Sequence, residues 1–195
     1  MDKIAVFCEL VVEANKTTNL VSKTDEQKLM TRHVADSLKF AEFLTLDSSL
    51  SNFNSKWADI GSGAGFPVIP LCIHLPQIKF YAIEPRKKRY EFLTSVKQKL
   101  NLQNVEIIQR KTETCGLKNM DFVSCRAVGS LEEDFIRAKK ILKPGGQFLT
   151  VKSKRIIEEL KLKNDKLLKI AKIWEYRLPQ EEQEYALINI SILPL

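Results

Sequence analysis

Apolar residues near the N-terminus recur at the spacing of one helix face: Ile4, Phe7, Cys8, Val11 and Val12. This period predicts a helix over residues 1–15. A second helix is predicted to run from Asp25, acting as its N-cap, to about residue 43. A stretch rich in serine and asparagine, residues 47–55, separates this helical start from the rest of the chain.

From residue 57 onward, short apolar runs alternate with longer segments of helical period. The predicted strands are 57–60, 79–84, 104–109, 121–125, 147–151, 170–177 and 185–192. The predicted helices of this part are 66–75, 86–100, 131–142 and a charged helix from about residue 155. This alternation indicates an α/β fold, with a mostly parallel sheet covered by helices on both faces. The last two strands have no helix between them, so they are predicted to pair as an antiparallel edge hairpin.

The composition indicates a single globular domain in a reducing compartment. The chain of 195 residues contains no apolar run of the ~18 residues that a membrane span needs. Four cysteines without C-x-x-C spacing indicate reduced thiols in the cytoplasm, and with only two histidines they argue against a metal site. The formal net charge of +7 favours a polyanionic partner such as nucleic acid, although lysine-rich genomes also give basic proteins without that role.

The most informative segment is the glycine-rich turn after the first predicted strand, residues 56–65 with the sequence KWADIGSGAG. Glycines at 61, 63 and 65 permit backbone conformations that a Cβ would forbid, so the chain can turn sharply and a ligand can approach. A helix beginning near Phe66 would point unpaired N–H groups at that ligand. Glu84 ends the next strand, about 20 residues on, where nucleotide-binding folds hold a ribose hydroxyl. The turn and the acid together indicate a ligand that contains ribose.

The glycine turn has three other interpretations. A dinucleotide fingerprint needs its third glycine where Phe66 stands, so a dehydrogenase is disfavoured. A phosphate-binding P-loop is excluded because no Gly-Lys-Ser/Thr follows the glycines. The remaining alternative is a tight turn that binds nothing.

Residues 59–65 together with Glu84 resemble the S-adenosylmethionine site of the Rossmann-like methyltransferases. Residues 61–71, with the sequence GSGAGFPVIPL, resemble more narrowly the signature of the glucose-inhibited division protein B family, whose enzymes methylate N7 of a guanosine in bacterial 16S ribosomal RNA. Further matching segments follow in the same order: 19–21, 32–37, 88–93 and 126–127. The resemblance runs from about residue 15 to 152.

The resemblance implies a Rossmann-like methyltransferase fold with a mostly parallel seven-stranded sheet, an antiparallel C-terminal edge hairpin and an N-terminal helical extension. Residues 1–50 are expected to form the extension and 55–195 the cofactor-binding core of one domain. The implied cofactor-binding residues are Gly61, Gly63, Gly65, Phe66, Glu84, Thr112, Glu113 and Arg126. The resemblance also makes Arg32 and His33 substrate-binding candidates, and the cation run at the start of the helix after Glu84 adds Arg86, Lys88 and Arg89 as groups for RNA phosphate.

Each of these assignments has a plainer alternative. Arg126 can be a surface arginine after a strand, Arg32 and Asp36 can form an ion pair one helical turn apart, and residues 86–89 can be a solvated helix start. The chain also departs from the family pattern: Val68 and Ser153 stand where glycine is usual, and Cys125 stands where serine is commoner. The start is shorter than in typical members, and the C-terminal third matches only in outline.

The chemistry that the resemblance implies needs no acid–base machinery. Guanine N7 has a lone pair and needs no deprotonation before it attacks a sulfonium methyl, so holding donor and acceptor in line supplies the catalysis. No residue is therefore expected to be catalytic, and Arg126 is a positioning candidate. The expected partner is 16S ribosomal RNA or the 30S subunit, with S-adenosylmethionine as cofactor, no metal and a monomeric enzyme. The alternatives are a methyltransferase for a small metabolite and an RNA-binding assembly factor without activity.

Overall fold

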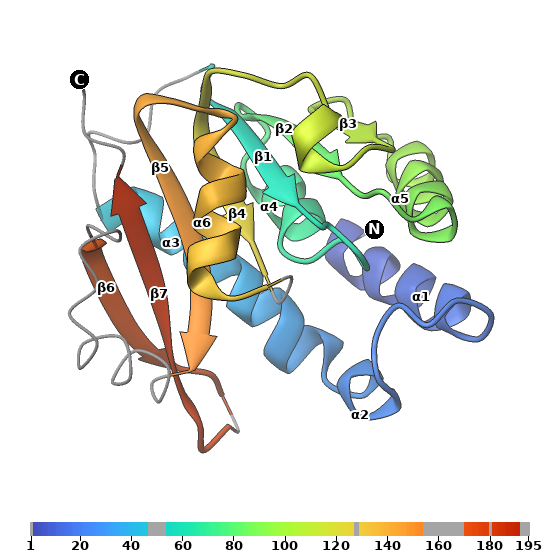
Figure 1. Cartoon of the computed structure of the whole chain (residues 1–195). Helices are drawn as coiled ribbons and strands as arrows, with labels where there is room; N and C mark the ends of the chain where they lie inside the picture. Colours follow the sequence, from blue (N-terminus) through green and yellow to red (C-terminus); the bar gives the residue numbers. More distant parts are fainter. Residues whose placement is uncertain (1, 47–53, 127–128, 154–169, 180, 192–195) are drawn as a thin grey trace.

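The computed structural model describes residues 2–46, 54–126, 129–153, 170–179 and 181–191, and it is built around one seven-stranded sheet (Figure 1). The strands lie in the order β3-β2-β1-β4-β5-β7-β6. Their bounds are β1 Lys56–Ile60, β2 Lys79–Ile83, β3 Val105–Ile108, β4 Met120–Cys125, β5 Leu142–Ser153, β6 Ile170–Arg177 and β7 Glu184–Ser191. The strands β1 to β5 pair in parallel, whereas β7 pairs antiparallel with both β5 and β6. The predicted α/β fold, with its antiparallel hairpin at the edge, is confirmed.

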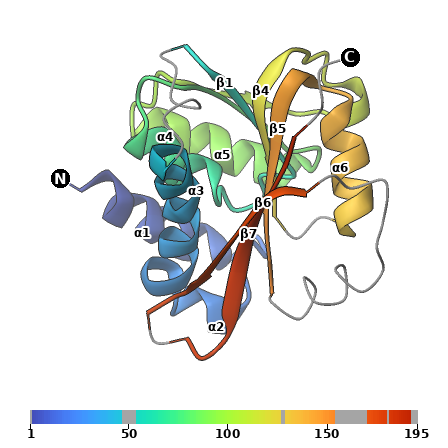
Figure 2. The ribbon, with the colours of Figure 1, turned by 90° about the vertical axis from the view of Figure 1, so that its left-hand side faces the viewer.

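Helices cover both faces of this sheet, as the edge-on view of Figure 2 shows. Their bounds are α1 Lys3–Asn15, α2 Lys23–Glu26, α3 Ala35–Leu46, α4 Val68–His74, α5 Lys87–Lys99 and α6 Leu131–Lys139. The side chains of α1, α3, α4 and α5 share a core with one face of the sheet, with Phe7, Phe40, Trp57 and Phe80 fully buried in it. On the other face α6 packs against a second core around Phe148. The N-terminal helices therefore belong to the same packed layer as α4 and α5.

The second predicted helix is wrong as a single regular element. It is divided into α2, a π-helix over Leu29–Val34 (η1) and α3. Ser22, and not Asp25, caps the start of α2: the Ser22 hydroxyl accepts the Asp25 N–H at 3.1 Å. A π-helix turns more slowly than an α-helix and places its side chains in a different rotation, and such insertions are frequent at functional sites. The search for apolar positions at a spacing of 3.6 residues cannot detect such a π-helix.

Other elements have bounds that differ from the prediction by one to five residues, among them the helix predicted over 131–142, which ends at Lys139. The helix predicted over 66–75 begins at Val68, because Gly65 at φ 95° still belongs to the turn. The strand predicted over 147–151 extends from Leu142 to Ser153, with a register shift against β4 near its start. The charged helix predicted from about residue 155 lies outside the described residues. Within the described ranges, no helix is long and apolar enough to cross a bilayer.

Candidate functional site

A cavity of about 460 Å³ opens where β1, β2 and β4 end, beside the N-terminal segment. Its lining is Leu20, Val21, Ser22, Asp25, His33, Gly61, Ser62, Gly63, Ala64, Phe66, Glu84, Pro85, Arg86, Arg89 and Arg126. Ligands of open α/β sheets bind outside the carboxyl ends of the strands, and pockets of roughly 300–1,000 Å³ hold small-molecule cofactors. The cavity has the position and the size of a cofactor site.

The carboxylate of Glu84 points at the glycine turn. Its Oε2 accepts the N–H of Gly63 at 3.0 Å, and its Oε1 accepts the N–H of Arg86 at 2.8 Å. Glu84 is only 3% exposed, yet it lines the cavity. Each carboxylate oxygen has two lone pairs, so each retains one for a further donor. The acid is thus fixed beside the turn and can still accept a hydroxyl from a ligand.

The glycine turn leaves space for a ligand, but several of its backbone N–H groups already have acceptors within the protein. Gly61 has φ 69° and Gly63 has φ 54°, conformations that L side chains rarely adopt. The N–H groups of Gly61 and Ser62 both donate to the carbonyl of Ile83, at 2.9 and 3.1 Å. The amides of Gly61 and Ser62 are therefore already hydrogen bonded, and the helix that was expected to begin near Phe66 starts at Val68.

Gly65 serves a different purpose from the other two glycines. A Cβ at this position would lie 2.9 Å from Ile69 Cγ1 and 3.1 Å from the Phe7 ring. Gly65 does not line this cavity, so the structure gives it a packing role between α1 and α4.

A second cavity of about 540 Å³ lies on the other side of the glycine turn. It is lined by Ile60, Gly61, Ile83, Pro85, Lys111, Thr112, Glu113 and Arg137. Thr112 and Glu113 belong to a short 3₁₀ helix, η2 (Thr112–Thr114), that follows β3. The two cavities share Gly61 and Pro85. Together they form a track across the ends of β1 to β4, bordered by seven of the eight predicted cofactor-binding residues.

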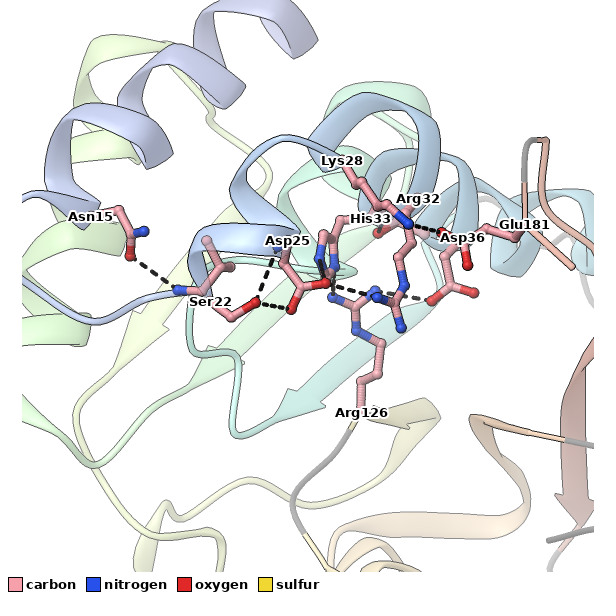
Figure 3. A network of polar contacts seen from close by, with 11 residues as sticks. Asn15, Ser22, Asp25, Lys28, Arg32, His33, Asp36, Arg126 and Glu181 are labelled. Atoms are coloured by element: carbon pink, nitrogen blue, oxygen red, sulfur yellow. Dashed lines mark hydrogen bonds and ion pairs between the residues drawn. The ribbon is translucent and has the colours of Figure 1, made fainter. Parts of the chain in front are cut away.

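Arg126, directly after β4, is held by the N-terminal segment (Figure 3). Its Nη1 donates to Asp36 Oδ2 at 2.9 Å, and its Nη2 lies 2.8 Å from His33 Nδ1. The guanidinium also lies 5.6 Å from the centre of the Phe66 ring. Arg126 is therefore not a freely solvated surface arginine; it is fixed at the wall of the first cavity by partners from η1 and α3.

The contact with Arg126 determines which ring nitrogen of the neutral His33 carries the proton. An arginine only donates, so Nδ1 must accept, and the proton of the neutral ring lies on Nε2. That nitrogen faces Asp25 Oδ1 at 3.3 Å, in ion-pair range but without the alignment of a hydrogen bond. Burial lowers the pKa of His33 to about 4, and the charge of Arg126 acts in the same direction. The neutral imidazole is the form that this site requires.

The other predicted substrate-binding residues, three arginines and a lysine, do not all face the cavities. Arg32 binds Asp25 at 2.8 Å and lines neither cavity, so the plainer alternative, an ion pair between Arg32 and Asp36, does not form. Arg86 and Arg89 line the first cavity, and Arg89 Nη2 also donates to the carbonyl of Asn19 at 3.1 Å. Lys88 is exposed and lies outside both linings.

Asp36 and Tyr176 belong to the site although neither is among the predicted site residues. Asp36 is 6% exposed and binds Arg126 through one oxygen and the Tyr176 hydroxyl through the other. The sequence suggests a pairing of Asp36 with Arg32, one helical turn away, whereas its partner in the structure is 90 residues away in the chain. Tyr176 stands in a segment without any motif, so no sequence signal marked it.

Among the described residues, no group of three or more His, Cys, Asp or Glu side chains lies close enough to hold a metal ion. The charged groups that line the two cavities are basic side chains together with the carboxylates of Asp25, Glu84 and Glu113. Such a set can hold and orient a polar ligand through fixed hydrogen bonds.

Comparison with known proteins assigns the fold and the family. The family model described as "GidB: rRNA small subunit methyltransferase G" matches residues 1–187. A ribosomal RNA small subunit methyltransferase G of Mycoplasma mobile is 38% identical over 170 residues, which cover 87% of this chain and 75% of that protein. The protein of the same name from Staphylococcus carnosus is 34% identical over 160 residues, covering 79% of this chain and 65% of that protein.

A solved structure supports the same fold. The crystal structure of M. jannaschii TYW2 in complex with AdoMet superimposes with a TM-score of 0.62 at 20% identity, covering 86% of this chain and 78% of that one. At this identity the likeness concerns the fold alone. The match of the family model over nearly the whole chain carries the assignment. This chain belongs to the GidB family, rRNA small subunit methyltransferase G, and has the fold of the S-adenosylmethionine-dependent methyltransferases.

Proposed function

We propose that this chain transfers the methyl group of S-adenosylmethionine to N7 of a guanosine in bacterial 16S ribosomal RNA. Family membership supports the reaction class and the ribosomal RNA substrate. The observation that carries the proposal to this chain is the orientation of Glu84, which is turned toward the glycine turn at the wall of an open cavity.

The residues present fit the cofactor. Two glycines with positive φ leave space where side chains would otherwise fill the cavity, and Glu84 retains lone pairs for the ribose hydroxyls. Thr112 and Glu113 border the second half of the track, where the adenine would lie. When bound, S-adenosylmethionine supplies an electrophilic methyl group on a sulfonium sulfur.

The protein's contribution is position and electrostatics. Guanine N7 attacks with its own lone pair, so no side chain has to remove a proton. Arg126, fixed by Asp36 and His33, is placed to orient the cofactor or the guanosine through its remaining donors. Holding the two reacting atoms in line supplies the rate enhancement. The neutral state of His33 is part of this arrangement, since it keeps a second positive charge away from Arg126.

RNA is proposed to approach over the basic mouth of the first cavity. Arg86 and Arg89 line this mouth, and the chain as a whole carries a formal charge of +7. Phosphate neutralisation by such groups dominates nucleic-acid affinity. We further propose a monomeric enzyme that acts in the cytoplasm, and a single domain for residues 1–195. The core that α1 and α3 share with α4 and α5 supports the single domain.

Calorimetric titration with S-adenosylmethionine tests the cofactor site. Glu84→Gln is expected to weaken binding at least about tenfold, because the amide replaces one acceptor oxygen by a donor. Glu91→Gln, which neutralises an exposed carboxylate on α5, is the control and should bind like the wild type. Wild-type affinity in the Glu84 variant would contradict the assignment. A wild type that binds no S-adenosylmethionine would instead favour the assembly-factor alternative.

A further inference from the structure

We propose that Asp36 and Tyr176 are positioning residues for Arg126, so that the edge hairpin of the sheet takes part in building the site. The inference deepens the proposed function and rests on it for its kinetic consequence. It starts from one chain of contacts: the Tyr176 hydroxyl binds Asp36 Oδ1, and Asp36 Oδ2 binds Arg126 Nη1.

Asp36 has its two oxygens committed in opposite directions. A buried carboxylate is costly unless its charge is paired and its lone pairs are hydrogen bonded. Arg126 supplies the opposite charge on one oxygen, and Tyr176 supplies a hydroxyl donor on the other. With both ends fixed, the carboxylate cannot rotate about its own axis. The guanidinium fork, bound at Nη2 by His33 as well, is held in a single plane.

Tyr176 is itself placed by the edge hairpin. It lies on β6, the outermost strand, in register with Tyr185 of β7, and the two rings stack with their centres 6.0 Å apart. Lys39 of α3 lies 5.9 Å from the centre of the Tyr176 ring. Burial raises the pKa of Tyr176, and the negative charge of Asp36 raises it further, so the hydroxyl keeps its proton and donates. The hydrogen bond therefore has one direction at any physiological pH.

This arrangement gives the C-terminal hairpin a function beyond closing the sheet. Loss of the Tyr176 hydroxyl would leave Asp36 Oδ1 buried without its hydrogen-bond donor. The carboxylate would then rotate toward another donor. Arg126 would then lose the geometry in which the first cavity needs it, although every residue that touches the cavity would still be present. Small displacements of an orienting group lower turnover strongly.

The test compares Tyr176→Phe with two matched controls. Tyr185→Phe removes the neighbouring hydroxyl, which is buried near Arg32 and has no hydrogen bond to Asp36 or Arg126. Lys28→Met removes a different tie between the N-terminal segment and the hairpin, the ion pair with Glu181 at 3.0 Å. Melting temperatures show whether all three variants fold. Tyr176→Phe is expected to lower kcat/KM for methyl transfer to 30S subunits about tenfold, while both controls stay within twofold of the wild type.

A double-mutant cycle separates positioning from general destabilisation. Arg126→Lys retains a positive charge but not the two-sided fork. In the Arg126→Lys background, Tyr176→Phe should lower kcat/KM less than twofold, because the guanidinium that Tyr176 positions is already absent. An equal loss in both backgrounds, or equal losses for Tyr176→Phe and Tyr185→Phe, would overturn the proposal.

Nuclear magnetic resonance provides a readout that does not depend on activity. The Nε–Hε signal of Arg126, assigned with Arg126→Lys, should shift or broaden in Tyr176→Phe and in Asp36→Asn, and remain unchanged in Tyr185→Phe. An unmoved signal in Tyr176→Phe would overturn the positioning proposal even if the wild type transferred methyl groups. A wild type without methyl transfer, but with the expected shift, would contradict the proposed function and leave the positioning role supported.

Discussion

Arg126 contacts Asp36 and His33, which lie about 90 residues earlier in the chain. The chemistry of these two side chains limits the roles that Arg126 can have. Asp36 already neutralises its charge, and His33 accepts from its second nitrogen. An arginine in this state orients a ligand through fixed N–H donors more than it attracts one through net charge. The sequence could mark Arg126 and His33 through the family resemblance. It could not pair them, because the pairing depends on how η1 packs against the end of β4.

The protonation of His33 is the sharpest prediction at this scale. Burial and the charge of Arg126 lower its pKa from the ordinary 6.5 to about 4. Because the folded-state pKa is the lower one, the neutral ring stabilises the fold fully above pH 6.5, and this contribution is lost as the pH falls toward 4. A titration of the histidine Cε1–Hε1 signals should show one resonance with a midpoint near 4.

The other histidine, His74, is exposed at the end of α4, and a His74→Gln variant assigns the two signals. Arg126→Ala should move the His33 midpoint upward, because the repelling charge and the donor to Nδ1 are both removed. A midpoint near 6.5 for His33 in the wild type would contradict the contact with Arg126.

At the scale of elements, β1 ends in a buried acid that the turn and β4 enclose. Asp59 is 1% exposed, and its Oδ1 accepts the Ser124 hydroxyl at 2.6 Å, while its Oδ2 has no partner among the described residues. Burial raises the pKa of Asp59 to about 7. The strand and the turn are therefore packed around a carboxyl group that prefers to be neutral.

This raised pKa makes the stability of the core depend on pH in a defined direction. The neutral acid stabilises the fold fully below the unfolded pKa of 3.8, and this contribution is lost as the pH rises through about 7. The amide in Asp59→Asn cannot ionise. The melting temperature of this variant should therefore rise relative to that of the wild type as the pH increases from 4 to 8. The surface variant Glu91→Gln is the control, and a gain that does not change with pH would contradict the buried, protonated state.

The elements also show where sequence patterns suffice. All seven predicted strands are present, because buried strands are short apolar runs between turn residues. The irregular helix after Ser22 was not predictable, because the π-helix η1 leaves no periodic signal in the sequence. The role of Gly65 was also hidden, because the clash with Ile69 and Phe7 exists only once α1 lies on α4.

At the scale of the whole molecule, two cavities and a basic mouth form one path across the carboxyl edge of the sheet. The structure divides the cation run 86–89 into residues with different surroundings: Arg86 lines the first cavity, whereas Lys88 is exposed outside both. The sequence alone does not show which of these four consecutive cations lines the cavity. The orientation of α5 against the sheet decides it.

This division predicts different salt dependences for RNA binding. Arg86→Ala should reduce the slope of log K against log salt concentration by roughly 0.7 to 0.9, the contribution of one phosphate contact. Lys88→Ala removes the same charge from the same helix and should leave the slope unchanged. Equal slopes for the two variants, measured by filter binding of 16S ribosomal RNA, would show that the cavity mouth is not where RNA binds.

The most direct measurement of the central claim is to incubate 30S subunits that lack 16S methylation with the chain and methyl-labelled S-adenosylmethionine, and then map the label. Nucleoside mass spectrometry with reverse-transcription mapping should find one N7-methylguanosine in 16S ribosomal RNA, formed more slowly at limiting S-adenosylmethionine when Glu84→Gln replaces the wild type. Label on small acceptors only, on another atom of the RNA, or nowhere in the presence of a folded protein would contradict the account.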